Sequence, residues 1–331
     1  MPNEHGLGTS AGARRAVVGA LALAACSGRG GEGAGTAPGA GEAVAVTARC
    51  AASSTASGGE GGVNSEYDVT YATRGGEALR YDVAWPRGGG GPHALVVLLH
   101  GGGWEGGSRA SMHDEMAALA RRGYAAAAVE YRLTRASRDV FPAAVADVRC
   151  AVRVLRARAD RYDLDPGRVA AVGFSAGAHL ASMLGAAADA DGLDEPCDAG
   201  GDAAVRAVIS YAGPQDLRVN GPYTREQARL VTNFLGVFPG DDPRRATLAS
   251  PIVHAGPGDP PFLLVHGTRD ELVPVGHSRR MAAALRRAGT PATVLELRGK
   301  GHAWVGLLAS GNDRVRCTAE AFLARWLGAG G

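Results

Sequence analysis

A serine flanked by two glycines follows a short apolar run in the middle of the chain. Residues 169–172 lead into Gly173-Phe174-Ser175-Ala176-Gly177, and a helix-forming stretch begins at residue 178. A Gly-x-Ser-x-Gly pattern between a strand and a helix is typical of a nucleophile elbow, a strained turn in which glycines permit close packing. The pattern predicts Ser175 as a nucleophile whose hydroxyl is exposed at the end of the strand.

A serine nucleophile needs a base to remove its proton and an acid to orient that base. Asp270 follows an apolar run at 261–266, and His302 follows another at 293–297. The chain order Ser175, Asp270, His302 is therefore available for such a triad. Glu271 and Asp313 are alternative acids.

The segment His-Gly-Gly-Gly-Trp at 100–104 ends an earlier apolar run, residues 94–99. Consecutive glycines there would place backbone N–H groups where an oxyanion forms during acyl transfer. The alternative reading is a plain glycine turn. Two further histidines, His179 and His266, are interpreted as packing or hydrogen-bonded structural residues.

Aromatic and aliphatic side chains flank these segments and are candidates for an apolar substrate pocket, with ordinary core packing as the alternative. They are Trp104, Phe174, Tyr211, Leu272 and Trp304.

Short apolar or alternating runs, separated by helical patterns, predict the elements that position these residues. The expected strands are residues 67–73, 79–85, 94–99, 124–129, 169–172, 205–211, 261–266 and 293–297. Helices are expected at 112–122, 142–162, from 178, at 277–288 and at 314–327. Strands that alternate with helices predict one α/β domain with a doubly wound, mostly parallel sheet of eight strands. Residues 214–251 fit no strand and contain an amphipathic piece at 226–235, so they are expected to form a short cap over the carboxyl edge of the sheet.

The N-terminal region has the pattern of an export signal. Arg14 and Arg15 precede an apolar run at 16–25 that is too short to span a bilayer. Leu23-Ala24-Ala25-Cys26 resembles the lipobox of bacterial lipoproteins, which implies cleavage before Cys26 and its lipidation. We therefore expect a signal peptide at 1–25, a flexible Gly/Ala/Ser-rich tether at 26–62 and the folded domain at 63–331. The expected location is the outer face of the cell membrane, and the alternative is a secreted protein with an incidental cysteine.

Four other cysteines, Cys50, Cys150, Cys197 and Cys317, are an even number in a chain with an export signal. Four cysteines allow three pairings, and free thiols are the alternative. Helices on the same sheet face would bring Cys150 near Cys197, which leaves Cys50 for Cys317.

The charge balance and the motifs argue against two classes of partner, nucleic acid and metal ions. The chain has 35 basic and 33 acidic residues, a formal net charge of +2, and therefore no field that favours nucleic acid. No CxxC or HExxH pattern occurs, so we expect no metal.

Over about 66–327 the chain resembles the carboxylesterase and feruloyl-esterase-like branch of the α/β-hydrolases. The motifs are HGGGW at 100–104, EYRL at 130–133, FPAAVADV at 141–148, GFSAGAHLA at 173–181, SPIVH at 250–254, HGTRDELVP at 266–274 and GKGHAW at 299–304. This resemblance implies a Ser175–His302–Asp270 triad, oxyanion donors at Gly102, Gly103 and Ala176, a small-molecule ester substrate and no cofactor.

The resemblance leaves three other functions open. Two are enzymes: an amidase of the kynurenine-formamidase type and a peptidase similar to prolyl oligopeptidases. The third is a non-catalytic surface lipoprotein that keeps the fold as a binding module.

Overall fold

A computed structural model describes residues 62–88, 90–219, 224–303, 306–309 and 311–328. Two units divide the chain, Met1–Glu42 and Ala43–Gly331, and every described residue belongs to the second. The predicted signal peptide with Cys26, nearly all of the predicted tether, Cys50 and Trp304 lie outside the described residues.

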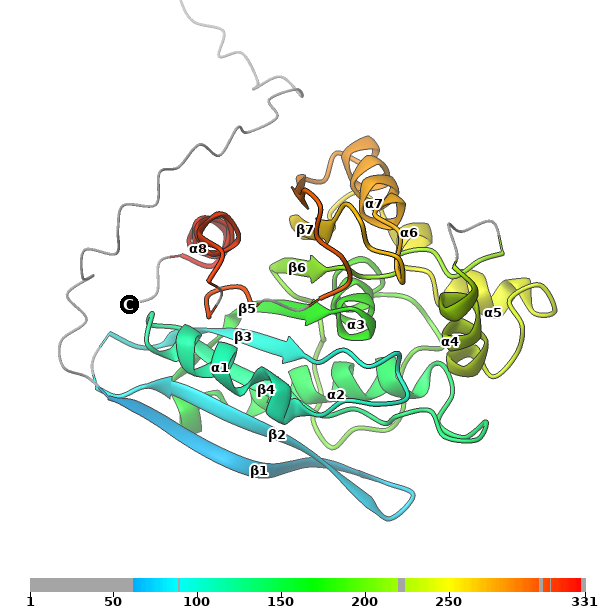
Figure 1. Cartoon of the computed structure of the whole chain (residues 1–331). Coiled ribbons are helices and arrows are strands. Elements are labelled where there is room, and N and C mark those ends of the chain that lie inside the picture. Colours follow the sequence, from blue (N-terminus) through cyan, green and yellow to red (C-terminus); the bar gives the residue numbers. More distant parts are fainter. Residues whose placement is uncertain (1–61, 89, 220–223, 304–305, 310, 329–331) are drawn as a thin grey trace, which may run out of the picture. The chain divides into compact units, whose positions relative to one another are not determined.

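One sheet of eight strands carries the fold (Figure 1). The strands are β1 (Val63–Arg74), β2 (Glu77–Pro86), β3 (His93–Leu99), β4 (Ala125–Val129), β5 (Leu164–Phe174), β6 (Ala207–Tyr211), β7 (Phe262–Gly267) and β8 (Ala292–Leu297). Their spatial order is β1-β2-β4-β3-β5-β6-β7-β8. The pairs β1/β2 and β2/β4 are antiparallel and all other pairs are parallel, which confirms the predicted fold class.

Helices cover both faces of this sheet. The longer helices are α1 (His113–Ala120), α2 (Ala143–Ala157), α3 (Ala176–Ala186), α4 (Arg225–Leu235), α7 (Gly276–Arg287) and α8 (Asp313–Leu327). Shorter pieces are η1 (Arg109–Met112), η2 (Ala159–Tyr162), α5 (Pro243–Leu248) and α6 (Pro251–His254). One buried cluster joins α2, α3 and α7 to the sheet, and a second joins α1 and α8 to the opposite face.

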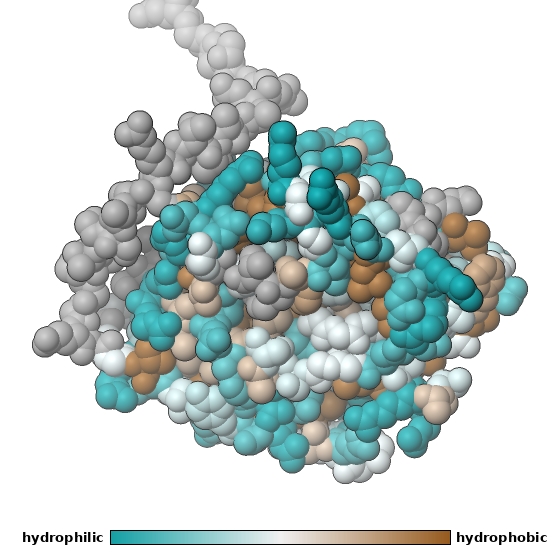
Figure 2. Space-filling model, in the orientation of Figure 1, coloured by the Kyte–Doolittle hydropathy of each residue, from teal (hydrophilic) through white to brown (hydrophobic). Residues whose placement is uncertain are grey.

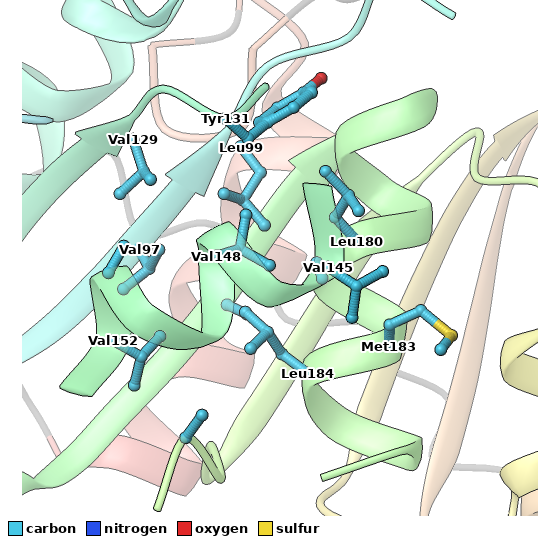
Figure 3. Close-up of a cluster of buried hydrophobic side chains, with 14 of the residues drawn as sticks. Val97, Leu99, Val129, Tyr131, Val145, Val148, Val152, Leu180, Met183 and Leu184 are labelled. Carbon is cyan, nitrogen blue, oxygen red and sulfur yellow. The ribbon is translucent and has the colours of Figure 1, made fainter. Parts of the chain in front are cut away.

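The central strand β3 shows how the sequence produces these two layers. Successive side chains of a strand point to opposite faces, so Val97 and Leu99 pack in the first cluster while Val96 and Leu98 pack in the second. Figure 3 shows the first cluster, where valines of α2 meet Val97 and Leu99. Burial on both faces explains why β3 is an uninterrupted apolar run.

The strand that leads to Ser175 is longer than predicted. We expected it at 169–172, but β5 begins at Leu164. Leu164 and Asp165 pair with the start of β3, and pairing then resumes at Val169 after an irregularity. Pro166 lies within this interruption, and its lack of an N–H group is compatible with a break in the ladder.

Helices α4 and α5 lie in the predicted insertion, beyond the carboxyl ends of the strands (Figure 1). Thr224 caps α4 by accepting a hydrogen bond from the Gln227 N–H, and Gly236 ends it in the left-handed conformation. Figure 2 shows apolar residues gathered over this insertion, where Val219 and Phe238 are exposed large apolar side chains. Within the described ranges, no helix is long and apolar enough to cross a membrane.

Cys150 of α2 and Cys197, in the loop after α3, form a disulfide with a Cα–Cα distance of 5.7 Å. It closes a loop of 47 residues that contains Ser175. Cys317 is disulfide-bonded as well. Because Cys50 lies outside the described residues, its pairing with Cys317 remains a prediction.

Candidate active site

Ser175 occupies the sharp turn between β5 and α3. Its backbone has φ 53° and ψ −117°, a strained conformation for a residue with a side chain. A Cβ atom on Gly173 would lie 2.1 Å from the Gly177 carbonyl oxygen, and one on Gly177 would lie 2.1 Å from the Leu99 carbonyl oxygen. Both glycines are therefore required by close packing, and this packing places the elbow directly against the end of β3.

Three residues from three separate loops form one hydrogen-bonded chain. His302, after β8, has its Nε2 atom 2.9 Å from the Ser175 Oγ atom. Its Nδ1 atom is 2.7 Å from Oδ2 of Asp270, which lies in the loop after β7. The predicted triad residues thus lie together at the carboxyl edge of the sheet, where ligands of doubly wound folds bind.

The hydrogen-bond partners determine the tautomer of His302. An ionised carboxylate can only accept hydrogen bonds, so Nδ1 carries the proton and donates a hydrogen bond to Asp270. Nε2 is then unprotonated and accepts a hydrogen bond from the Ser175 hydroxyl. This is the arrangement that a general base requires.

The carboxylate of Asp270 has donors on both oxygens. Oδ1 accepts from the N–H groups of Leu272, at 3.0 Å, and Val273, at 2.8 Å. Oδ2 accepts from His302 and also lies 3.3 Å from Nε2 of the fully buried His266. Burial opposes ionisation of Asp270, but the hydrogen bonds from His266 and His302 outweigh it and hold the pKa of Asp270 below its usual range.

His266 is thus part of the surroundings of the acid, a role that sequence reasoning did not assign beyond a structural one. Its Nε2 atom donates to the Val273 carbonyl oxygen at 2.7 Å, so Nδ1 is free to accept from Ser278 Oγ at 2.7 Å. The only signal in the sequence is the spacing His266-x-x-x-Asp270, which becomes informative once the loop brings the two side chains together.

The predicted oxyanion donors lie beside the nucleophile. A Cβ atom on Gly101 would lie 2.7 Å from Cδ1 of Phe174, so the glycine turn packs against the residue before Ser175. Gly102 has φ 127° and Gly103 has φ 61°, values that favour glycine. Among the described residues, no acceptor is found for the backbone N–H groups of Gly102, Gly103 and Ala176. Within the described part of the chain these three N–H groups are therefore available as hydrogen-bond donors.

The predicted pocket residue Trp104 instead supports this turn. Trp104 is 2% exposed, stacks on Phe234 of α4 at 4.4 Å between ring centroids, and donates its indole N–H to His179 Nδ1 at 3.3 Å. His179 donates from Nε2 to the Ala249 carbonyl oxygen at 2.8 Å, and burial lowers its pKa to about 4. Trp104 and neutral His179 therefore join the glycine turn, the nucleophile helix and the insertion. The pocket assignment of Trp104 is corrected accordingly, because an indole with this packing offers almost no surface to a ligand.

The other predicted pocket residues differ in exposure. Phe174 is half-buried and its ring centroid lies 5.1 Å from that of His302, so it borders the reacting atoms. Leu272 is half-buried in the loop after β7 that carries Asp270. Tyr211 is 2% exposed and packs behind Phe174, at 5.9 Å between ring centroids, so it belongs to the core rather than to an open pocket wall.

Glu115 of α1 connects the segment after His302 to the body of the fold. Its buried carboxylate accepts hydrogen bonds from the N–H groups of Leu307, Leu308 and Ala309, at 2.7 to 3.2 Å. No sequence pattern assigned a role to Glu115. The described part of the chain holds no group of three His, Cys, Asp or Glu residues arranged to bind a metal ion.

A doubly wound, mostly parallel sheet with a strained serine at a strand-to-helix turn, joined to His302 and Asp270, defines the α/β-hydrolase class. The BD-FAE family model matches residues 81–285 of this chain. The chain belongs to the BD-FAE family.

Curated relatives and solved structures agree with this assignment. Esterase LipQ of Mycobacterium tuberculosis is 33% identical over 69% of this chain and 53% of the relative. Esterase LipC of the same organism is 31% identical over 64% of this chain and 53% of the relative. The chain thus spans about half the length of these curated relatives. The apo form of Thermogutta terrifontis esterase 2 superposes with a TM-score of 0.68, at 26% identity, over 81% of this chain and 96% of that structure.

Proposed function

We propose that this protein is a serine hydrolase that cleaves carboxylic esters of small molecules through an acyl-enzyme. The observation that carries this proposal is the hydrogen-bonded chain from Ser175 through His302 to Asp270, with His302 in the tautomer of a base. The N–H groups of Gly102, Gly103 and Ala176, which have no acceptor among the described residues, support it because acyl transfer develops negative charge on the carbonyl oxygen.

The residues suffice for a two-step acyl transfer. Ser175 Oγ attacks the ester carbonyl carbon while His302 Nε2 takes its proton, and Asp270 stabilises the resulting imidazolium. The glycine turn and Ala176 bind the tetrahedral oxyanion. His302 then returns the proton to the leaving alcohol oxygen, and water repeats the sequence on the acyl-enzyme to release the acid.

The relatives favour an ester as the substrate class. LipQ and LipC are esterases by name, and one solved structure is Thermogutta terrifontis esterase 2 phosphonylated by sarin. By the proposal, phosphonylating reagents would likewise react with Ser175 of this chain.

Labelling with a fluorophosphonate probe, together with hydrolysis of p-nitrophenyl esters, tests this proposal. We expect wild-type protein to be labelled and to hydrolyse the esters, and Ser175→Ala to lose both properties. Ser182→Ala is the matched control, because Ser182 lies on the same helix with its hydroxyl bonded to the Ala178 carbonyl oxygen. Labelling or ester turnover that survives in a folded Ser175→Ala protein would contradict the assignment. Feruloyl and formamide substrates in the same panel distinguish an esterase from a formamidase.

We further propose that the protein is exported and held at the outer face of the cell membrane by a lipid on Cys26. The lipobox-like sequence before Cys26 supports this proposal. Cys26→Ser is expected to move the protein from the membrane fraction to the soluble fraction. Unchanged fractionation would contradict the anchor and leave the esterase proposal intact.

A further inference from the structure

Helix α4 of the insertion contacts two segments of the site. One is the acid loop, which follows β7 and carries Asp270, and the other is the oxyanion turn, the glycine turn at residues 101–103. At its N-terminal end, Thr224 donates from Oγ1 to the Leu272 carbonyl oxygen at 3.1 Å, two residues after Asp270. At its C-terminal end, Phe234 stacks on Trp104. With 11 residues, α4 is about 16 Å long, enough to pass across the catalytic edge.

Polar and charged side chains stabilise the contact between α4 and the oxyanion turn. Arg229 of α4 donates to Glu105 at 2.7 Å, and Asn233 donates to the same carboxylate at 2.9 Å. Glu105 follows Trp104 directly in the sequence. The oxyanion turn and α4 are therefore held together by ring stacking and by charge-assisted hydrogen bonds.

Leu230 lies between these contacts and faces the oxyanion turn. A Cβ atom placed on Gly103 would lie only 2.6 Å from Cδ2 of Leu230, so the leucine side chain packs against the backbone of Gly103. Leu230 is half-buried and shares one face of α4 with Phe234, four residues later. It therefore lies directly against Gly103, one of the predicted oxyanion donors.

The direction of proton transfer indicates which part of an ester this leucine would meet. His302 must return its proton to the leaving alcohol oxygen, so the alcohol lies on the His302 side of the carbonyl carbon. Phe174 borders that side, through its contact with His302. The oxyanion faces the N–H groups of the glycine turn, so the acyl chain takes the remaining direction, and we assign it to the side of the turn that Leu230 borders.

We propose that Leu230 is a specificity-determining residue that limits the length of the acyl chain. This inference rests on the proposed esterase function. Shortening Leu230 would open space beside Gly103 for additional methylene groups of the acyl chain. Each methylene group that an apolar pocket accommodates raises kcat/KM for the longer substrate relative to the shorter one about tenfold or more.

The test compares kcat/KM for p-nitrophenyl acetate, butyrate and octanoate in wild-type and variant proteins. Leu230→Ala is expected to raise the octanoate-to-acetate ratio roughly tenfold or more. Leu230→Val should shift the ratio in the same direction by less, and it keeps the test available if the alanine variant does not fold. Leu248→Ala is the matched control, because Leu248 is another half-buried leucine of the insertion and is expected to leave the ratio unchanged.

A second series, acetate esters of alcohols of increasing length, is expected to give the same profile in wild type and Leu230→Ala. An unchanged acyl profile in Leu230→Ala and Leu230→Val would overturn the proposal, as would an equal shift in Leu248→Ala. A change confined to the alcohol series would overturn the acyl assignment. Failure of the esterase proposal looks different, because wild-type protein would then neither hydrolyse any ester nor take up the fluorophosphonate.

Discussion

An Asp270→Asn substitution would present His302 with a donor in place of an acceptor. Two backbone N–H groups, those of Leu272 and Val273, already occupy Oδ1 of Asp270. The asparagine carbonyl oxygen would stay with these two donors, and its NH₂ group would therefore face Nδ1 of His302. His302 would respond by moving its proton to Nε2, where it faces the Ser175 hydroxyl and leaves no lone pair to accept the serine proton.

The size of the loss follows from this change of tautomer. A triad whose imidazole is held in the wrong tautomer loses on the order of 10⁴-fold in kcat, which corresponds to roughly 5 kcal/mol of transition-state stabilisation. KM should change little, because neither the proposed oxyanion donors nor Leu230, proposed to border the acyl chain, are altered. Steady-state kinetics with p-nitrophenyl acetate near neutral pH measures both constants.

Glu271→Gln provides the matched control, because Glu271 is the exposed neighbour of Asp270 in the same loop. It is expected to keep near wild-type kinetics. If Asp270→Asn retained activity within about tenfold of wild type, the derived orientation of the asparagine and the role of Asp270 would both be refuted. An inactive Glu271→Gln beside an active Asp270→Asn would move the acid by one position.

Three further predictions concern stability. The Cys150→Ala/Cys197→Ala double variant opens a closed loop of 47 residues and is expected to lose about 4 kcal/mol of unfolding free energy in urea titration; an unchanged midpoint would contradict this. Glu115→Ala leaves three backbone N–H groups without their acceptor and should lower both kcat and the unfolding free energy, the latter by roughly 3 kcal/mol. The exposed neighbour provides the control, since Asp114→Ala should change neither quantity. Equal effects of the two substitutions would refute the role of Glu115. Because the pKa of Asp270 is lowered in the folded protein, its ionised form stabilises the fold above the unfolded value of about 4, and this contribution is lost as pH falls through the folded pKa. Urea titrations at several acidic pH values should show a shallower decline in Asp270→Asn, and parallel declines would contradict the assignment.

Local sequence signals predicted the elements and the residues of the site because each signal depends on near neighbours. The two glycines beside Ser175 are required by contacts that any such elbow makes, and the uninterrupted apolar run of β3 reflects burial on both faces. The ends of parallel strands meet at one edge of a sheet, so residues just beyond β5, β7 and β8 could be grouped in advance although Ser175 and His302 are 127 residues apart.

The surroundings of these residues were decided by tertiary structure. Nothing in the linear sequence reveals that Trp104 turns inward onto Phe234, because an aromatic residue beside a glycine turn is equally compatible with a pocket and with the core. Glu115 and the segment it holds are separated by more than 190 residues, and only the packing of α1 against that segment creates the need for a buried acceptor.

The contact between Leu230 and Gly103 has the same origin. Helical periodicity indicates which face of α4 is apolar, but the direction of that face relative to the oxyanion turn depends on how the insertion folds back over the sheet. The sequence by itself thus determined the class of protein and predicted the residues that are proposed to carry its chemistry, since these follow from short-range patterns. The conformation of the loop after β7 decided that His266 and the N–H groups of Leu272 and Val273 surround Asp270. Only the tertiary structure decided which residue covers the glycine turn, because Leu230 and Gly103 lie in segments far apart in the chain.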